Sequence, residues 1–358
     1  MRILQIIDSL EAGGAEKVAV NYANSLLQAT GFSALTATRK EGSLKNQLDG
    51  KVDYFFLNKK GKLDLKAILR LRSFCKQHQI DWVHAHGSSF FTAVLLKLVL
   101  PKIKIIWHDH YGMSAFLATR NTTVLQFCSL FFFGIVAVNA ILQQWAQKEL
   151  WCKNVIYLPN YTNFTKTIVA GSSLQGEAGK RILCLANLRP QKNHFLLIKV
   201  AKIIREHFPK WTFHLVGKDF EDGYSTEIRH LIESEKLQKH VYIYGSRNDT
   251  EFVIQQCDIA ILTSKSEGLP IALLEYGLHQ KPVVVTHVGE IPQIIQNAVN
   301  GFLVPSEEPE LFAGALSKLI NDETLRRNLG SALYKTIEQN NSETAVITQY
   351  LLWLKKKI

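Results

Sequence analysis

The sequence lacks the cysteine patterns that build disulfide frameworks or metal sites. Its 358 residues include five scattered cysteines, none of them in a CxxC pair or a Cys/His spacing suited to zinc. A disulfide-rich secreted class is therefore excluded, and buried free thiols in a reducing cytoplasm are predicted. The first apolar run, MRILQII, is too short for a signal peptide and has no small-residue cleavage site after it, so it predicts a first strand.

Long uninterrupted apolar runs are also missing. Residues 124–142 approach the length that spans a membrane, but Gln126, Ser129, Gly134 and Asn139 interrupt them. We therefore predict that this stretch forms a helix followed by a buried strand.

Acidic residues are scarce in the first half of the chain. Residues 1–160 hold 19 Lys and Arg against 10 Asp and Glu, whereas the remainder holds 23 against 21. The positive half indicates an anionic surface or substrate as a partner, although solubility alone is a rival explanation. No nucleic acid partner is predicted, because the sequence has no recognisable binding module and no interleaved aromatic and basic strip. We expect a cytoplasmic protein that could lie peripherally on the inner face of the cytoplasmic membrane.

Short apolar runs alternate with amphipathic segments along the whole chain, which predicts an α/β fold built on parallel sheets. A Gly-, Ser- and Thr-rich stretch, VAGSSLQGEAGK, interrupts this pattern and indicates a domain junction. We expect one domain over 1–163, a linker over 164–180, a second domain over 181–341, and a C-terminal helix over 342–358 that could pack back on the first domain. Strands are expected at 2–7, 33–38, 52–56, 82–85, 103–107, 135–138 and 155–158, then at 182–185, 212–216, 241–244, 259–262, 283–285 and 301–304.

The stretch SEGLPIALLEYGLHQKPVVV places two acids near a helix start. Pro270 suits a first helical turn, so a helix is predicted at about 270–279. Glu267 then lies in the loop before this helix and Glu275 lies within it, so two acids face one small space from different elements. A helix N-terminus between two strand ends is where anionic ligands bind in open α/β sheets.

Several motifs together resemble one family. The segments GGAEK (residues 13–17), NLRPQKN (187–193) and SEGLPIALLE (266–275) occur in the order seen in the retaining glycosyltransferases of family 4, as do LPN (158–160) and VNGFLVP (299–305). The similarity covers nearly the whole chain. It implies the GT-B fold, in which two doubly wound Rossmann-like domains face each other across a cleft.

The resemblance also implies roles in a donor site. Lys192 matches the lysine that binds the donor diphosphate, Glu267 the acid on the reacting face of the transferred sugar, and Glu275 the acid that accepts hydrogen bonds from the donor ribose. Arg189 is less direct, because the family arginine usually stands where this chain has Asn187; we expect Arg189 to take over its role. Other residues expected at the donor are Gly14, Gly268, Leu269, Pro270, Ile271 and Arg247, with Pro270 unable to offer an N–H.

Histidines follow two predicted strands of the first half, in HAHG (84–87) and WHDHYG (107–112). We expect these groups at the carboxyl edge of the sheet. His108 matches the family histidine beside the transferred sugar, so it is assigned to catalysis with Glu267, Arg189 and Lys192. The residues expected to meet the acceptor are Gly13, Glu16, His86, Asp109 and His110, with strand-end capping as the structural alternative for His84 and His110.

No metal site is predicted from these histidines. Side chains two apart point the same way only while a strand persists, and enzymes of this kind usually work without a metal or other cofactor. The expected activity is retaining, metal-independent transfer of a hexose or N-acetylhexosamine. The donor is a nucleotide-diphosphate sugar, with UDP favoured and GDP next. The expected acceptor is a glycan, lipid-linked for preference, in bacterial cell-surface polysaccharide synthesis. A nucleotide-sugar 2-epimerase of the same fold and a non-catalytic sugar-nucleotide binder are the alternatives.

Overall fold

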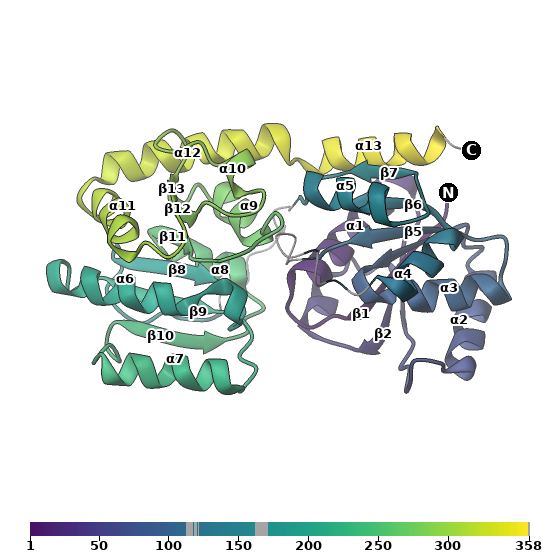
Figure 1. The fold of residues 1–358 in the computed structure, drawn as a ribbon, viewed down its shortest axis with the longest axis horizontal. Coiled ribbons are helices and arrows are strands. Elements are labelled where there is room, and N and C mark those ends of the chain that lie inside the picture. Colours follow the sequence, from purple (N-terminus) through teal and green to yellow (C-terminus); the bar gives the residue numbers. More distant parts are fainter. Residues whose placement is uncertain (112–116, 118–119, 121, 162–170, 357–358) are drawn as a thin grey trace. The chain divides into compact units, whose positions relative to one another are not determined.

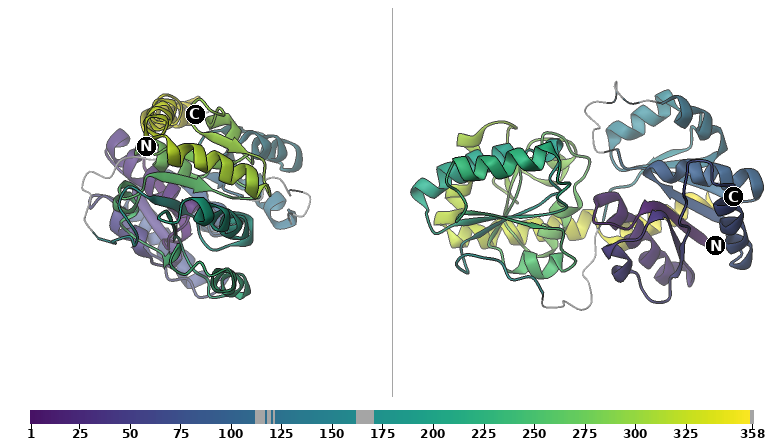
Figure 2. Two further views of the ribbon diagram at one scale, coloured as in Figure 1. Left: turned by 90° about the vertical axis from the view of Figure 1, so that its left-hand side faces the viewer. Right: turned by 90° about the horizontal axis from the view of Figure 1, so that it is seen from below.

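The computed structural model describes residues 1–111, 117, 120, 122–161 and 171–356. The chain divides into two compact units. Unit 1 comprises Met1–Tyr161 and Glu343–Ile358, and unit 2 comprises Thr162–Ser342. Each unit is a parallel sheet with helices on both faces (Figures 1 and 2). The expected linker at 164–180 lies partly outside the described residues.

Unit 1 is built on a seven-stranded parallel sheet in the order β3-β2-β1-β4-β5-β6-β7. The order reverses between β1 and β4, so this sheet is doubly wound, as predicted. Its strands are β1 (Ile3–Ser9), β2 (Ala34–Lys40), β3 (Asp53–Phe56), β4 (Trp82–His86), β5 (Lys104–Asp109), β6 (Phe132–Ala137) and β7 (Val155–Tyr157).

The helices of unit 1 cover this sheet in two layers. Apolar residues of α2 (Leu65–Gln77), α3 (Phe90–Val99) and α4 (Thr123–Cys128) form one core with one face of the sheet. α1 (Gly14–Thr30) and α13 (Glu343–Lys355) contact each other and pack on the opposite face. The remaining elements are α5 (Ala140–Glu149) and the short 3-10 helices η1 (Ser43–Gln47), η2 (Gly87–Ser89) and η4 (Ser129–Phe131).

The C-terminal helix α13 is tied to unit 1 by aromatic residues. Tyr350 is fully buried, its hydroxyl lies 3.1 Å from Nδ1 of His84, and its ring packs edge-on against Tyr22 of α1 at 5.3 Å. Trp353 donates a hydrogen bond to Asn154 and lies where a side chain on Gly134 would have to be. α13 therefore completes the core of unit 1, although it comes from the far end of the chain.

Unit 2 has a six-stranded parallel sheet in the order β10-β9-β8-β11-β12-β13. The order reverses between β8 and β11. The strands are β8 (Arg181–Leu185), β9 (Thr212–Val216), β10 (Val241–Gly245), β11 (Ile259–Leu262), β12 (Val283–Thr286) and β13 (Phe302–Val304). The helices are η5 (Pro190–Lys192), α6 (His194–His207), α7 (Gly223–Ser234), α8 (Thr250–Gln255), α9 (Ile271–Leu278), α10 (Ile291–Ile294), α11 (Pro309–Asn321) and α12 (Glu323–Asn340).

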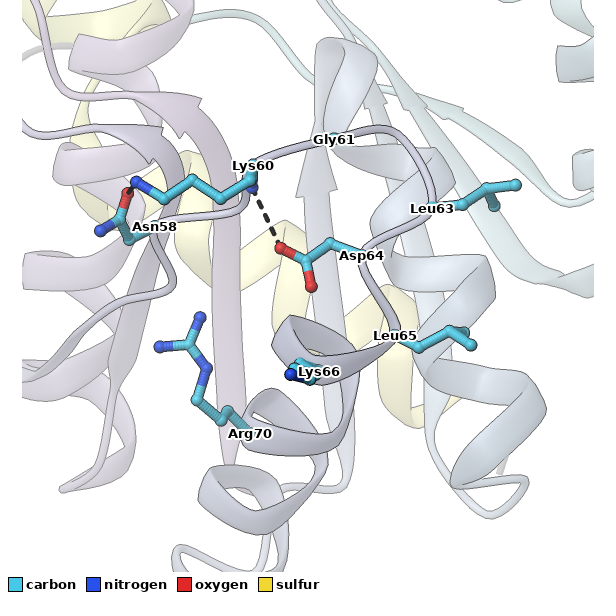
Figure 3. A pocket seen from close by; sticks show the side chains of 8 residues that line it. All are labelled: Asn58, Lys60, Gly61, Leu63, Asp64, Leu65, Lys66 and Arg70. Atoms are coloured by element: carbon cyan, nitrogen blue, oxygen red, sulfur yellow. Dashed lines mark hydrogen bonds between the residues drawn. The ribbon is translucent and has the colours of Figure 1, made fainter.

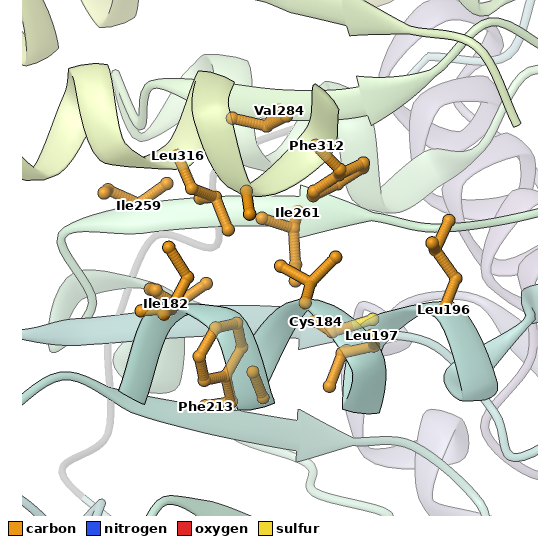
Figure 4. Close-up of a cluster of buried hydrophobic side chains, with 14 of the residues drawn as sticks. Ile182, Cys184, Leu196, Leu197, Phe213, Ile259, Ile261, Val284, Phe312 and Leu316 are labelled. Atoms are coloured by element: carbon orange, nitrogen blue, oxygen red, sulfur yellow. The ribbon is translucent and has the colours of Figure 1, made fainter. Parts of the chain in front are cut away.

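The main core of unit 2 lies between its sheet and the pair α6 and α11. Phe213, Phe312 and Leu316 are at most 1% exposed there, and they pack with the apolar side chains of β8 and β11 (Figure 4). On another side α9 packs against α12, and Gly277 lies so close to Leu333 and Ile337 that a Cβ would have to push them away. A glycine within α9 therefore sets how closely these two helices approach.

The stretch at 124–142 divides as its polar interruptions predicted. It forms α4 and η4, then β6, and the first turn of α5. Among the described residues, no helix is both long and apolar enough to cross a membrane. The five cysteines are buried and free, which confirms the prediction of free thiols.

We predict that unit 1 depends on the aromatic anchor of α13. Replacing buried Tyr350 with Ala should lower the free energy of unfolding by about 3–5 kcal/mol, because it leaves a cavity and removes the partner of His84. Leu352→Ala on the same helix is the matched control, since Leu352 is 52% exposed, and it should cost less than about 0.5 kcal/mol. Urea unfolding of the two variants tests this. Equal losses would contradict the anchoring role.

Candidate active site

The strand order of unit 2 places two loops beside each other at the carboxyl edge of its sheet. The chain leaves β8 into η5 and leaves β11 toward α9, and the strand order reverses between these two neighbouring strands. Ligands of doubly wound sheets bind at this position. The predicted donor residues Arg189, Lys192, Glu267 and Gly268 all lie on these two loops.

A buried ion pair joins the two loops. Nζ of Lys192 lies 2.6 Å and 2.8 Å from the two carboxylate oxygens of Glu267, and the Ser264 hydroxyl donates to the same carboxylate at 2.6 Å. Glu267 is 5% exposed, whereas the side chain of Lys192 is 23% exposed. The carboxylate is thus buried, whereas the lysine side chain that pairs with it is partly exposed.

Backbone contacts fix the lysine side of this pair. The carbonyl of Lys192 accepts a hydrogen bond from the Thr263 hydroxyl at 3.1 Å, and the carbonyl of Gln191 accepts one from the N–H of Lys265 at 2.8 Å. At the end of β8, the N–H of Leu185 donates to the hydroxyl of Tyr276 on α9 at 2.6 Å. η5 is therefore attached both to the loop after β11 and, through β8, to α9.

A glycine fixes the carboxylate side. Gly289 has a φ of +57°, and a Cβ there would collide with the carbonyls of Glu267 and Gly268. Next to it, the N–H of Glu290 donates to the Gly268 carbonyl at 3.1 Å, and the Thr286 hydroxyl donates to the Ser264 carbonyl at 2.7 Å. The loop after β12 therefore packs on the Glu267 loop, and only glycine permits this close approach.

The start of α9 lies beside the pair. Pro270 is the N-cap residue with a ψ of 125°, so the helix begins one residue later than predicted, at Ile271. Leu269 and Ile271 are 3% and 8% exposed, and Glu275 is half-buried in the second turn of the helix. Glu267 and Glu275 thus come from the loop and the helix, as predicted, and the roles of these residues toward a donor stay predictions.

Arg189 and Asn187 make different contacts in the structure. The guanidinium of exposed Arg189 lies 4.3 Å above the ring of Phe220, which follows β9. Asn187 accepts a hydrogen bond from the N–H of Lys218 at 2.8 Å and so holds the loop after β9. Arg189 is therefore a cation at the same edge as Lys192, stacked on an aromatic ring that sequence reasoning missed.

Arg247 follows β10 at the same edge of the unit 2 sheet. Its side chain is half-buried, it donates to the Ser246 carbonyl at 3.2 Å, and its guanidinium lies 5.9 Å from the centre of the Tyr244 ring. This edge therefore carries three cations on two loops, with Arg189 and Lys192 after β8 and Arg247 after β10. Such an arrangement can stabilise negative charge that develops on a bound phosphate.

In unit 1 the glycine loop precedes α1. Gly13 is the extended N-cap residue of α1, and a Cβ there would collide with the carboxylate of Glu16. Glu16 therefore folds back over the first turn, a favourable place for an acid at a helix start. A Cβ on Gly14 would meet no other atom of the described residues within 4 Å, so the described packing does not itself require glycine there.

The histidines predicted to face a ligand are buried. β4 continues through His86 and β5 through Asp109, so His84, His86 and His108 all lie on one face of the sheet under α1 and α13. None is more than 1% exposed, and the edge-on ring of Tyr22 lies 5.5 Å from His108. The expectation that His86 and His108 stand open at the strand ends is wrong, because both strands are longer than their apolar runs.

Burial keeps these imidazoles neutral. It lowers the pKa of His84, His86 and His108 well below the ordinary value, and that of His110 to about 3. His86 is bonded on both sides, to His110 at 2.9 Å and to the Gln5 side-chain oxygen at 2.8 Å. His84 is bonded to Tyr350 and His110 to His86, which suits the structural alternative for these two, whereas neither ring nitrogen of His108 has a hydrogen-bond partner among the described residues.

Ring nitrogens of His84, His86 and His108 lie within 4.8 Å of one another, which is the only possible metal-binding group among the described residues. The premise that the strands end too early for such a group is therefore wrong. His86 suits a metal poorly because both of its ring nitrogens are already bonded, whereas Nε2 of His84 and both nitrogens of His108 have no hydrogen-bond partner among the described residues.

Asp109 has a partner that the sequence did not indicate. Its carboxylate is 1% exposed and accepts two hydrogen bonds from Arg120, at 2.7 and 2.8 Å. The guanidinium of Arg120 also lies 4.2 Å from the ring of Trp145. This bidentate pair occupies the carboxylate that was expected to orient an acceptor. Eleven residues separate the two partners, and no local pattern indicates their pairing.

The chain matches two halves of one family. Residues 12–163 match Glycosyltransferase Family 4, and residues 168–336 match Glycosyl transferases group 1. These matches cover both units in order, together with the site at the carboxyl edge of unit 2. The chain therefore belongs to the family 4 glycosyltransferases, and its two doubly wound units are those of the GT-B fold.

Individual relatives agree with this class. The chain is 24% identical over 319 residues to the UDP-Gal:alpha-D-GlcNAc-diphosphoundecaprenol alpha-1,3-galactosyltransferase of Escherichia coli, covering 80% of each chain. It is 25% identical to the amylovoran biosynthesis glycosyltransferase AmsD of Erwinia amylovora, covering 93% of this chain and 94% of AmsD. Among solved structures, Anabaena HepE in complex with UDP and glucose superposes with a TM-score of 0.81 at 19% identity, covering 99% and 100% of the two chains.

We predict that acid destabilises unit 1 through its neutral histidines. Burial lowers the pKa of these histidines in the folded protein, whereas in the unfolded chain the pKa is near 6.5. Below pH 6.5 the unfolded chain therefore binds protons that the folded protein does not, and the free energy of unfolding falls as the pH falls. At pH 5 each histidine kept neutral costs up to about 2 kcal/mol. His108→Phe removes one such group, and should therefore flatten the loss of stability between pH 7.5 and 5.

Chemical denaturation at several pH values measures this slope. His207→Gln is the control, because His207 is exposed at the end of α6 and should leave the slope unchanged. A His108→Phe slope that equals the wild-type slope would show that His108 can be protonated in the folded protein.

Proposed function

We propose that this protein transfers a hexose or N-acetylhexosamine, with retention of anomeric configuration, from a nucleotide-diphosphate sugar to a glycan acceptor. The observation that carries the proposal is the Lys192–Glu267 pair at the strand-order reversal of unit 2, in which the lysine side chain is still partly exposed. UDP is the favoured nucleotide, because the galactosyltransferase relative is named for UDP-Gal and HepE was solved with UDP. A GDP-sugar is the next choice.

The proposed chemistry needs no protein nucleophile. The bond between the anomeric carbon and the β-phosphate oxygen breaks as the acceptor oxygen bonds to the same face of that carbon. The acceptor proton passes to the departing phosphate oxygen. Lys192 and Arg189 stabilise the negative charge that develops on the leaving diphosphate. Glu267 holds Lys192 in place and offers its carboxylate to sugar hydroxyls, while Glu275 accepts from the ribose.

Metal independence is part of the proposal. In place of a divalent cation, the site offers the side chains of Lys192 and Arg189 and the N–H groups at the start of α9. These are fixed positive groups that need no ion to hold a diphosphate. Transfer should therefore continue at full rate in EDTA.

A lipid-linked glycan of bacterial cell-surface polysaccharide synthesis is the proposed acceptor. The support is the Escherichia coli relative, whose name includes a diphosphoundecaprenol-linked sugar, and AmsD, whose name includes amylovoran biosynthesis. His110, the N-cap residue Gly13 and Glu16 in the first turn of α1 are the proposed acceptor contacts. His108 is proposed to act through the buried histidine layer, where it would support His110.

The test compares two neighbouring lysines in sugar transfer. Lys192→Ala should lower kcat/KM by about 100- to 1000-fold, since it removes a cation that stabilises the leaving group. Lys265→Ala is the matched control: Lys265 lies on the adjoining loop, pairs with exposed Glu307 at 2.9 Å, and should stay within about twofold. The assay uses radiolabelled UDP-sugars and GDP-mannose with extracted lipid-linked glycans. Equal activities of the two variants would contradict the proposed donor site.

The same assay separates the alternative activities. A 2-epimerase would convert the nucleotide sugar when no acceptor is present, and chromatography of the recovered sugar would reveal the epimer. A non-catalytic binder would bind UDP in a thermal-shift measurement but release none from a UDP-sugar with any acceptor. The proposal requires UDP release that depends on the acceptor.

A further inference from the structure

Exposed apolar side chains are concentrated on one layer of unit 1. Of the fourteen large apolar side chains that are exposed among the described residues, ten lie between residues 63 and 151, which is about a quarter of the chain. The outermost are Leu65 and Leu69 on α2, Leu98 on α3, and Val124, Phe127 and Leu130 on α4 and η4, each more than half exposed. Scattered leucines are ordinary on a surface, but a concentration of this kind marks an interaction site.

These side chains belong to neighbouring helices. α2 contacts α3 and α3 contacts α4, all on the face of the sheet opposite α1 and α13 (Figure 1). Phe127 extends the layer to Trp151, with the two rings 5.1 Å apart. We call the outer surface of α2, α3, α4 and η4, with Trp151, the helical face.

Positive charge is concentrated in the same part of the chain. Residues 57–153 carry thirteen Lys and Arg against four Asp and Glu, and bidentate pairing with Arg120 neutralises one of these acids, Asp109. Trp151 stands between the exposed lysines Lys148 and Lys153. Lys59 is buried, but Lys62, Lys66 and Arg70 are exposed at and just before the start of α2, so apolar and basic side chains share the helical face and its margins.

The first turn of α2 shows this mixture at close range. An open hollow of about 880 Å³ is lined by Lys60, Lys66 and Arg70, by one acid, Asp64, and by exposed Leu63 and Leu65 (Figure 3). The carboxylate of Asp64 accepts a hydrogen bond from the N–H of Lys60 at 3.0 Å and caps α2, so cations outnumber acids there. Lys60 turns toward Asn58, while the two leucines point away from the guanidinium of Arg70. One surface thus presents cations that can bind phosphate groups and aliphatic side chains that can contact lipid acyl chains.

We infer that the helical face of unit 1 binds the surface of an anionic lipid bilayer. Lysines and arginines near such a surface attract its phosphates, while leucine, valine and phenylalanine enter the boundary between headgroups and acyl chains. A nucleic acid would leave the aliphatic side chains without a partner. A second copy of the chain would bring two positive surfaces together, which is unfavourable.

The inference rests on the proposed function and sharpens it. A lipid-linked acceptor stays in the bilayer, so its enzyme must work at that surface. In the apolar run 125–133, Leu125, Cys128 and Phe132 are buried in the core, whereas Phe127, Leu130 and Phe131 are exposed.

Vesicle sedimentation tests the inference with the full chain. The vesicles contain phosphatidylglycerol and phosphatidylcholine in equal parts, with pure phosphatidylcholine for comparison. We expect binding to the anionic vesicles that weakens at least tenfold between 0.05 and 0.5 M NaCl. Phe127→Ser/Leu130→Ser should weaken partitioning at least tenfold, and Lys62→Gln/Lys66→Gln should weaken it about tenfold or more.

Two control pairs make the same chemical changes in unit 2. Val299→Ser/Leu311→Ser removes exposed apolar side chains, and Lys199→Gln/Lys239→Gln removes exposed charges; both should stay within twofold of wild type. Thermal unfolding checks that every variant is folded. The inference would be overturned if all four double variants bound vesicles equally weakly, or if the wild type did not bind vesicles. It would also be overturned if a helical-face variant converted a dimer into a monomer without changing vesicle binding.

A second readout separates this inference from the proposed function. UDP-induced thermal stabilisation without vesicles reports the donor site of unit 2 alone. Helical-face variants that keep this stabilisation but lose vesicle binding support the inference. If UDP stabilises the wild type but the wild type does not bind vesicles, only the inference is overturned. If the wild type binds vesicles but no nucleotide, only the proposed function is contradicted.

Discussion

The ion pair between Lys192 and Glu267 is the contact on which the site of unit 2 depends. A buried carboxylate is costly unless it is paired and hydrogen-bonded, and here one ammonium and the Ser264 hydroxyl satisfy it. The pair joins residues 75 positions apart, so the loops after β8 and β11 are closed by it. Gly289 then lets a third loop press on the second. Three loops are held in one arrangement before any ligand arrives.

Unit 1 contains a layer of buried histidines and tyrosines. Four histidines and three tyrosines form a layer between the sheet and the helices α1 and α13, and burial keeps the histidines neutral. This layer attaches the last helix of the chain to the first sheet. The open helical face lies on the other side of the same sheet, where aliphatic core residues support it. One sheet therefore separates a closed polar interior from an interacting surface.

The sequence predicted most of the fold because apolar periodicity reports burial directly. The expected limits of β9 and β11 agree with the structure to the residue, and the polar interruptions at 124–142 correctly divided a long apolar run. α8 was missed, since its six residues are too short for a helical period. The motifs placed Lys192 and Glu267 on neighbouring loops, but nothing local could show that they pair.

The errors have one physical cause. Sequence patterns indicate which face a side chain is on but not how far a neighbouring helix covers it. β4 and β5 extend past their apolar runs, so histidines expected at an open edge are covered by α1 and α13. Arg120 could not be assigned to Asp109 either, because no local sequence pattern indicates a contact between residues 11 positions apart.

A double-mutant cycle on UDP binding tests the central claim most directly. Isothermal titration would compare wild type, Lys192→Ala, Glu267→Gln and the double variant. Because the two side chains share one contact, the loss caused by Lys192→Ala should change by at least about 1 kcal/mol when residue 267 is glutamine. Losses that add within about 0.5 kcal/mol would show that the pair does not act as a unit in the donor site, and would contradict this account.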